Sequence, residues 1–174
     1  MTSASIKLAI LSDTHGHMPE ATLAEIEAQQ VDAIVHAGDS ESAYALSQLE
    51  LIAPVIAVQG NCDWPSELAN LPQIAKQQFG NALLVVTHKP DDLETALRLV
   101  DVSSRSEGQS ETHNFIVGIH GHTHLPVIQH RGNLVILCPG SPVEPRGGSK
   151  ACIALLTLAV DGSDTPPFAE LISL

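Results

Sequence analysis

The first sixty residues alternate between short apolar runs and amphipathic segments. Three apolar runs, at 6–11, 32–38 and 54–60, have the length of buried strands. Between them lie two segments, at 19–30 and 41–51, whose apolar side chains recur at helical spacing. The pattern predicts a strand, helix, strand, helix, strand unit, which is typical of a parallel sheet with buried strands.

The second half of the chain is richer in strands. Two pairs of apolar runs are separated by the short turns Gly80-Asn81 and Arg131-Gly132-Asn133, and each pair predicts a hairpin. The predicted strands of this half lie at 73–79, 82–88, 115–119, 127–130, 134–138, 151–160 and 167–174. We therefore expect a single α/β domain, residues 1–174, that contains two sheets.

A helix and a loop are predicted between the two hairpins. Residues 91–100 have the helical period, whereas the polar segment 101–113 has no period at all. We expect this polar segment to be an exposed, mobile loop. Three possibilities are open for this segment: it covers a site, it mediates self-association or it has no role.

Length and cysteine content narrow the class of protein. A chain of 174 residues buries a sizeable core without disulfides or a structural metal, and its three cysteines are too scattered for a zinc knuckle. The N-terminus has no signal-peptide pattern, and the longest apolar run, 151–160, is too short to span a bilayer. We expect a soluble, cytoplasmic protein with no membrane partner.

The chain is strongly acidic. Twenty acidic and eight basic residues give a formal net charge of -12, which repels phosphate backbones and argues against nucleic acid as a partner. An anionic substrate must then be attracted by a local positive charge. Whether the protein forms a homo-oligomer is left open.

Polar residues with ligating side chains follow five of the predicted strands. Ligands gather at the carboxyl ends of the strands in such sheets. Residues i and i+2 of an extended segment point to the same side, so neighbouring pairs can direct two donors to one place. The candidates are Asp13, His15, Asp39, Asn61, His88, His122 and His124.

Two of these residues also have an ordinary structural interpretation. Asp13 and Asp39 each precede a predicted helix and would suit its N-cap. Five such loops at one sheet edge are hard to explain by capping alone. Seven donors are too many for one ion, but they suit two ions about 3.5 to 4 Å apart if one carboxylate bridges them. Carboxylate, amide and imidazole without thiolate favour manganese, iron or zinc.

The order of motifs resembles a known family. SDTHG (12–16), GD (38–39), GNCD (60–63), TH (87–88), GHTH (121–124) and CPGSPVEPRGG (138–148) together resemble the calcineurin-like metallophosphoesterase superfamily, in its small single-domain bacterial and archaeal phosphodiesterase branch. The resemblance implies a four-layer α/β/β/α sandwich with two facing mixed sheets.

The resemblance also implies a catalytic centre. It assigns one divalent ion to Asp13, His15 and His124, another to Asn61, His88 and His122, and the bridge to Asp39. A hydroxide held by both ions would then attack a small phosphodiester. Manganese is the preferred ion, with zinc, iron or nickel as alternatives. His120 has no place in this set, and we expect it to pack or to support a ligand.

Two residues depart from the wider family pattern. Cys62 stands where larger relatives have a histidine that protonates the leaving oxygen, and a thiol is a poorer acid. With Cys62 as the candidate catalytic acid, we therefore expect the protein to prefer leaving groups that need little protonation. His17 is the other candidate proton donor. Lys89 follows His88 where the family often has glycine, and it either adds charge for the substrate or is solvated. The alternative function is a protein-interaction scaffold of the same fold, like the retromer-subunit branch.

Overall fold

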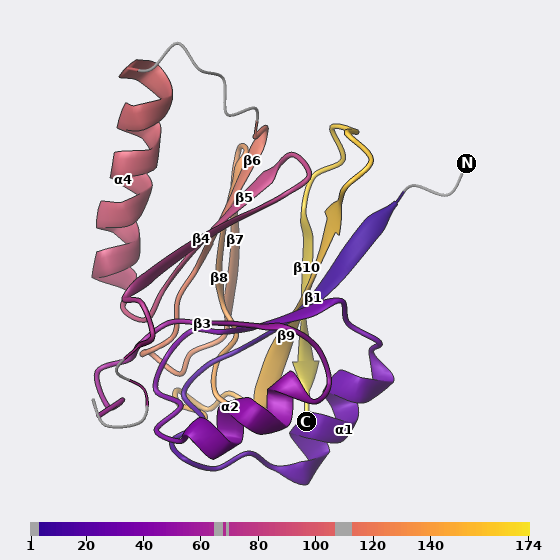
Figure 1. Ribbon diagram of the computed structural model, residues 1–174, viewed down its shortest axis with the longest axis vertical. Coiled ribbons are helices and arrows are strands. Elements are labelled where there is room, and N and C mark those ends of the chain that lie inside the picture. Colours follow the sequence, from indigo (N-terminus) through magenta and orange to yellow (C-terminus); the bar gives the residue numbers. More distant parts are fainter. Residues whose placement is uncertain (1–3, 65–67, 69, 107–112) are drawn as a thin grey trace.

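The protein, a computed structural model, is described over residues 4–64, 68, 70–106 and 113–174. Two five-stranded sheets face each other, and helices cover their outer faces (Figure 1). The helices are α1 (Glu20–Ala28), α2 (Ala43–Glu50) and α4 (Pro90–Ser106). The strands are β1 (Ser5–Leu11), β2 (Ala33–His36), β3 (Val55–Ala57), β4 (Ile74–Phe79), β5 (Ala82–Thr87), β6 (Phe115–Ile119), β7 (Val127–Arg131), β8 (Leu134–Cys138), β9 (Cys152–Ala159) and β10 (Phe168–Ser173).

The first sheet has the strand order β10-β9-β1-β2-β3. Strands β1, β2 and β3 are parallel, which confirms the predicted unit, and β9 and β10 add antiparallel strands beside β1. All four residues of β2 are buried, as expected of a strand covered on both faces. The helix α2 between β2 and β3 begins after Ser42, whose hydroxyl accepts a hydrogen bond from the Ala45 amide at 3.2 Å.

The second sheet has the order β4-β5-β6-β8-β7. The two predicted hairpins, β4-β5 and β7-β8, are both present as antiparallel pairs. Between them β5, β6 and β8 run parallel, so the carboxyl ends of β5 and β6 lie at one edge of the sheet. Both sheets are therefore mixed, as the family resemblance implied.

Three apolar clusters define the layers. The largest lies between the sheets and combines side chains such as Leu8 and Val35 with Leu84 and Val117. A second joins the outer face of the first sheet to α1 and α2, and a third joins the outer face of the second sheet to α4. The expected four-layer α/β/β/α sandwich is thus confirmed, with α1 and α2 on one side and α4 on the other (Figure 1).

The prediction that the polar segment 101–113 is a loop is partly wrong. Helix α4 continues to Ser106, six residues beyond the predicted end at 100, while residues 107–112 of the predicted loop lie outside the described residues. Adding a residue to an existing helix needs no new nucleus, so a polar segment without its own period can extend it. In the described part of the chain, no helix is both long and apolar enough to cross a membrane.

Candidate metal centre

The seven predicted ligands lie where the two sheets meet at their carboxyl ends. Asp13 and His15 follow β1, Asp39 follows β2, and Asn61 follows β3, all in the first sheet. The second sheet supplies the remaining three, which follow β5 and β6: His88, His122 and His124. The site therefore joins the two sheets, although each ligand comes from a short local loop.

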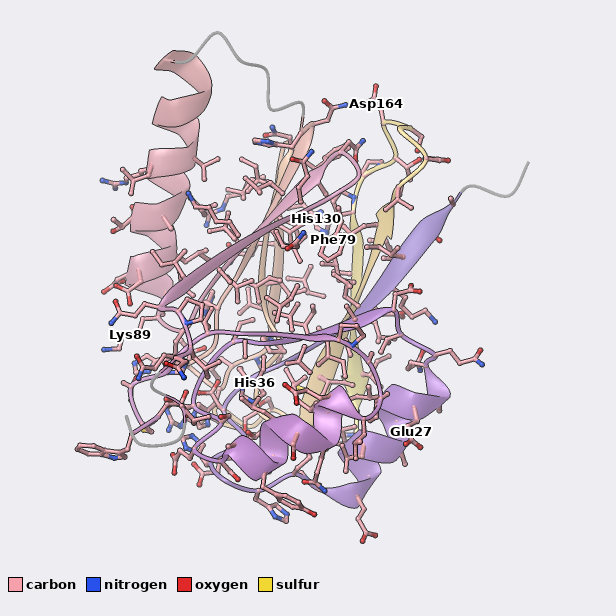
Figure 2. The ribbon with its side chains drawn as sticks, viewed as in Figure 1. Glu27, His36, Phe79, Lys89, His130 and Asp164 are labelled. Carbon is pink, nitrogen blue, oxygen red and sulfur yellow. The ribbon has the colours of Figure 1, made fainter. Side chains whose placement is uncertain are left out.

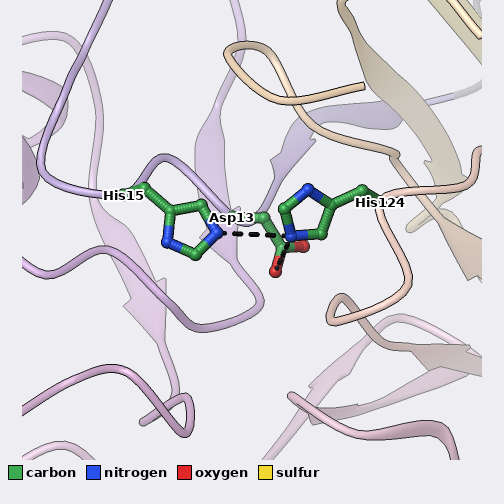
Figure 3. A group of neighbouring side chains, drawn as sticks. All are labelled: Asp13, His15 and His124. Carbon is green, nitrogen blue, oxygen red and sulfur yellow. Dashed lines mark hydrogen bonds and ion pairs between the residues drawn. The ribbon is translucent and has the colours of Figure 1, made fainter. Parts of the chain in front are cut away.

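One cluster contains Asp13, His15 and His124 (Figure 3). One ligand atom from each of these residues lies within 4.8 Å of the other two. The Nε2 atoms of His15 and His124 are 3.2 Å apart, and His124 Nε2 is 3.3 Å from Asp13 Oδ1. Asp13 and His124 are buried, so this cluster lies below the protein surface.

A second cluster contains Asp13, Asp39 and His88. His88 Nε2 lies 3.2 Å from Asp39 Oδ2 and 3.1 Å from the side-chain oxygen of Asn61. Asp13 is therefore common to both clusters, whereas the family resemblance assigns the bridging position to Asp39. Asn61 is exposed and marks the mouth of the site.

His122 stands beside the second cluster. Its ring contacts the His88 ring edge-on, with 5.2 Å between centroids, and its side chain is half-buried. Its backbone amide donates to both carboxylate oxygens of Asp13, at 3.1 and 3.0 Å. The structure thus brings all seven predicted residues to one place, with Asn61 and His122 at the side of the clusters.

Hydrogen bonds at the outer ring nitrogens set the tautomers of three histidines. His88 Nδ1 donates to the Ala37 carbonyl at 2.9 Å, and His124 Nδ1 donates to the Glu144 carbonyl at 2.7 Å. A carbonyl oxygen can only accept, so each Nδ1 must carry the proton. His15 Nδ1 donates to the Glu41 carboxylate at 2.5 Å. In each ring, Nε2 is left to face the site.

The convergence of these Nε2 atoms has a chemical consequence. With Nδ1 protonated, a neutral ring presents a lone pair at Nε2, and here such lone pairs face each other or face carboxylate and amide oxygens. Acceptors at about 3 Å repel one another unless a proton or a metal ion lies between them. The donor set of carboxylate, amide and imidazole therefore fits divalent transition-metal ions at both clusters.

The two carboxylates differ in their electrostatics. Burial favours the neutral form of Asp39, but hydrogen bonds with His88 and with the Cys62 amide outweigh it and hold the Asp39 pKa well below its usual value. Burial dominates at Asp13, where the hydrogen bond from Ser12 and the charges of His88 and His124 compensate only in part, so its pKa is raised. A bound cation would favour the charged form of Asp13 and offset this burial cost.

The histidines respond to the same environment. Burial disfavours the charged form of His88, but its contact with Asp39 prevails and raises its pKa. The pKa of His15 is raised in the same way, against burial, by Glu41. The pKa of His122 is lowered, first by burial and then by the positive charges of His88 and Lys89.

The backbone of the ligand loops is not extended, and the i, i+2 argument from the sequence is wrong in its geometry. Left-handed conformations occur at five of the seven predicted ligands, with φ between 44° and 66°. These five are Asp13, His15, Asp39, His122 and His124. Aspartate and histidine adopt this region more readily than most residues, but at a cost of about 1–2 kcal/mol each. The pairs still converge, because the chain turns sharply at each ligand.

Two glycines allow the loops to approach closely. A Cβ at Gly60 would lie 2.1 Å from Asp39 Oδ1, and a Cβ at Gly121 would lie 2.8 Å from Asp13 Oδ2. Atoms at these separations overlap, so neither position can hold a side chain while the carboxylates keep their places. These glycines bring backbone from β3 and β6 against the ligands that follow β1 and β2.

Three supporting residues were not assigned a role from the sequence. The buried Asp63 carboxylate accepts from the backbone amides of Asp39, Gly60 and Glu41, at 3.1, 2.7 and 2.6 Å. Glu41 in turn orients His15, and Ser141 donates to the backbone oxygen of Asp13 at 2.8 Å. Asp63 and Ser141 belong to the GNCD and CPGS motifs, so a signal existed for them. Glu41 has no motif of its own.

The candidate catalytic residue Cys62 lies at the site. Its backbone amide donates to Asp39 Oδ1 at 2.7 Å, and its sulfur accepts from the side-chain Nδ2 of Asn61 at 3.2 Å. Burial and the neighbouring Asp39 carboxylate raise the pKa of the Cys62 thiol to about 11. The group is therefore a neutral thiol at pH 7.

His120 and His36 lie behind the ligands. His120 is buried and its Nδ1 interacts with the Gly121 carbonyl at 3.0 Å, and it belongs to none of the ligand clusters found among the described residues. His36 is fully buried and interacts through Nε2 with the Thr14 hydroxyl at 3.0 Å (Figure 2). Both positions agree with packing or support of the predicted ligands, which is the role expected of His120.

The chain was compared with known families and structures. A family model for the calcineurin-like phosphoesterase superfamily domain matches residues 6–161. A probable metallophosphoesterase of Methanothermobacter thermautotrophicus is 31% identical over 162 residues, which cover 89% of this chain and 86% of that protein. Phosphodiesterase YfcE of Escherichia coli is 31% identical over 158 residues, which cover 86% of this chain and 71% of YfcE.

Solved structures share the fold. The structure of the phosphoesterase YfcE from E. coli superposes with a TM-score of 0.66 at 23% identity, covering 97% of this chain and 99% of that one. Wild-type Vps29 from Entamoeba histolytica, complexed with Zn²⁺, superposes with a TM-score of 0.65 at 15% identity, covering 96% and 98% of the two chains. The same architecture is thus found in a phosphoesterase and in Vps29.

Proposed function

The chain belongs to the calcineurin-like phosphoesterase superfamily, and from this premise we propose that it is a metal-dependent phosphodiesterase with a dinuclear centre. The observation that carries the proposal is the convergence of acceptor atoms from both sheets, with the Nε2 atoms of His15 and His124 only 3.2 Å apart. Relatives named as phosphodiesterases support a phosphoric diester hydrolase.

In this proposal the seven ligands divide between two ions. Asp13, His15 and His124 would hold one ion, Asn61, His88 and His122 the other, and Asp39 would bridge them. When bound, the ions would supply a bridging hydroxide as nucleophile and neutralise the charge that develops on the phosphate. The protein's part is to fix the donors: Glu41, Ala37 and Glu144 hold three of the imidazoles by their Nδ1 atoms.

Manganese is our proposed ion. The donor set lacks a thiolate, because the raised pKa of Cys62 keeps its sulfur protonated. Oxygen and imidazole donors with open positions suit manganese, and they also accommodate iron, zinc or nickel. Vps29 of Entamoeba histolytica has the same fold and is complexed with zinc, which supports zinc as an alternative ion.

The neutral thiol of Cys62 determines which leaving groups we expect. A thiol with a pKa of about 11 holds its proton at pH 7 and is a poor general acid there. Esters whose leaving group departs as a stable anion, such as aryl esters, should therefore react well, and alkyl phosphates should react slowly. Hydrolysis of bis-p-nitrophenyl phosphate and of an alkyl phosphate by manganese-loaded protein compares the two. Equal rates would contradict this part of the proposal.

A protein-interaction scaffold is the second candidate, since Vps29 has the same fold. All seven ligand positions carry good donors in this chain, which favours catalysis. Alanine substitution of His122 or Asp39 tests the choice, with bound metal and diesterase rate both measured. We expect both to fall together. If the diesterase rate survives unchanged, the dinuclear mechanism is refuted. Absence of diesterase activity in the metal-loaded wild type would instead favour the scaffold.

A further inference from the structure

A shallow pocket opens beside the position proposed for the second ion, which Asn61, His88 and His122 would hold. It has a volume of about 130 Å³ and is bordered by Asn61 and His88. Gln59, Gln73, Lys89 and Asp92 form the rest of its wall, together with Gly60. The pocket therefore adjoins two of the residues that would hold the second ion.

The wall of this pocket is built from segments of both sheets. Gln59 follows β3, and its backbone amide donates to the Pro72 carbonyl at 2.8 Å, which fixes Gln73 nearby. Lys89 and Asp92 lie at the start of α4, directly after β5 (Figure 2 labels Lys89). The Lys89 carbonyl accepts from the Leu93 amide at 3.1 Å and from the Thr87 hydroxyl at 3.0 Å. The backbone that carries these side chains is thus held in place.

The side chains of the wall keep their hydrogen-bonding capacity. Among the residues that the structure describes, Gln73, Lys89 and Asp92 make no side-chain hydrogen bond or ion pair to the rest of the protein. These three residues are exposed, so one carboxamide, one ammonium and one carboxylate border the pocket with donors and acceptors to offer.

The charges of the wall decide between classes of occupant. Its one cation and one anion cancel, so a second anionic group of a substrate gains no net attraction from the wall. An apolar aryl arm would leave the carboxamides and charged groups without partners, which costs affinity. A neutral arm with hydroxyl groups can donate to Asp92 and accept from Lys89 and Gln73.

The volume limits the size of this arm. An apolar cavity of about 150 Å³ holds one benzene ring, so a pocket of this size accepts one small ring or a short polyol. We propose that the pocket binds the non-leaving arm of the phosphodiester, and that this arm is a neutral hydroxylated group the size of a ribose or a glycerol. The inference rests on the proposed phosphodiesterase function.

Three substrates with the same leaving group test the pocket. They are p-nitrophenyl esters of phosphate whose second arm is methyl, glyceryl or thymidine-5′-yl, assayed with the full-length, manganese-loaded protein. We expect kcat/KM for a hydroxylated arm to exceed that for methyl by about tenfold, as expected for one to two hydrogen bonds. A gain shared by both hydroxylated arms assigns the pocket to a polyol, whereas a gain for thymidine alone assigns it to a sugar ring.

Matched variants connect this preference to the wall. Asp92→Ala and Gln73→Ala should each reduce the hydroxylated-to-methyl ratio by about fivefold. Asp91→Ala in the same first turn of α4 and Gln77→Ala on β4 lie outside the pocket and should leave the ratio unchanged. Binding of thymidine 5′-phosphate and methyl phosphate, measured by calorimetry, should show the same loss of discrimination. Two pocket variants are used so that misfolding of one of them does not decide the test.

The outcomes separate this inference from the proposed function. If none of the three esters is hydrolysed by the loaded protein, the phosphodiesterase function itself fails. If all are hydrolysed with similar kcat/KM, or if the ratio survives both pocket substitutions, the function stands and the pocket is not the arm-binding site.

Discussion

The orientation of His15 depends on one carboxylate. Its Nδ1 donates to Glu41 at 2.5 Å, whereas the corresponding atoms of His88 and His124 use backbone carbonyls that substitution cannot remove. Glu41→Ala should weaken manganese binding by about 10- to 100-fold, and Glu41→Gln, which keeps an acceptor oxygen, should weaken it less. Calorimetric titration with Mn²⁺ measures this. The exposed Glu50 at the end of α2 provides the control, as Glu50→Ala. Wild-type affinity in Glu41→Ala would show that Glu41 does not position the ligand.

The left-handed backbone at the ligands stores strain. His122 has a φ of 66°, where glycine fits freely and alanine does not. Both His122→Gly and His122→Ala remove the imidazole, so their difference reports the backbone alone. Without metal, we expect the glycine variant to be the more stable by about 1 kcal/mol in urea unfolding. Thr123, next in the same loop, has no positive φ and should show the opposite order. A His122→Ala variant as stable as His122→Gly would argue against strain.

The buried His36 makes stability depend on pH. Burial lowers its pKa from 6.5 to about 4, so the folded protein binds this proton less readily than the unfolded chain does. The stabilisation is complete above pH 6.5 and is lost as the pH falls toward 4, by about 1.4 kcal/mol per pH unit and about 3 kcal/mol in total. Urea unfolding between pH 4.5 and 7.5 should therefore show a shallower pH dependence in His36→Gln than in wild type. Parallel curves would mean that His36 binds its proton equally well in the folded and the unfolded protein.

At the scale of elements, the contact of Leu93 with Gly118 is one of those that pack α4 on the second sheet. Gly118 in β6 has no side chain, and a Cβ there would lie 3.2 Å from Leu93 Cδ2 and 3.2 Å from Ile136 Cδ1. Leu93 is buried and fills this space. Leu93→Ala should reduce the free energy of unfolding by about 2–5 kcal/mol, because it leaves a cavity. Gly118→Ala should destabilise wild type by crowding but be neutral or stabilising in the Leu93→Ala background. Equal effects of Gly118→Ala in both backgrounds would contradict the contact.

The elements that could be predicted from the sequence are those with a local signal. The strand and helix periods between 6 and 60 and the turns Gly80-Asn81 and Gly132-Asn133 are local, and the predicted elements are present there. The antiparallel position of β9 beside β1 joins segments about 150 residues apart, which no local pattern encodes. The end of α4 was missed because helix propagation, rather than a local period, extends it to Ser106.

The candidate site was predictable in its residues but not in its conformation. Motif order identified the seven residues, and the structure brings them together. The left-handed backbone at Asp13 or Asp39 was not predictable, because neither is glycine and the cost of that conformation is met by long-range contacts such as those of Asp63. Glu41 was missed because a lone glutamate in a loop has no spacing signal.

For the whole molecule, the position of the candidate site between the sheets would couple metal binding to stability. Predicted ligands that follow β1, β2 and β3 meet predicted ligands that follow β5 and β6, so bound ions would connect the two sheets at this edge. The apolar core between the sheets is large and contains no predicted ligand. The metal-free protein should therefore stay folded and unfold cooperatively. Two effects oppose this stability: the clustered acceptor atoms repel one another at the site, and the chain carries a net charge of -12.

Removal of metal should lower the melting temperature without unfolding the protein. Two sites each saturated at about 100 times their Kd stabilise the fold by about 2.7 kcal/mol apiece, about 5 kcal/mol together. At about 2–4 °C per kcal/mol for a chain of this size, EDTA should lower Tm by about 10–20 °C in calorimetry, and Mn²⁺ should restore it. His122→Ala, which lacks a ligand of one proposed ion, should show a smaller shift. A chelated protein without a cooperative transition would mean that the core alone does not support the fold, and an unchanged Tm would mean that the clusters bind no metal.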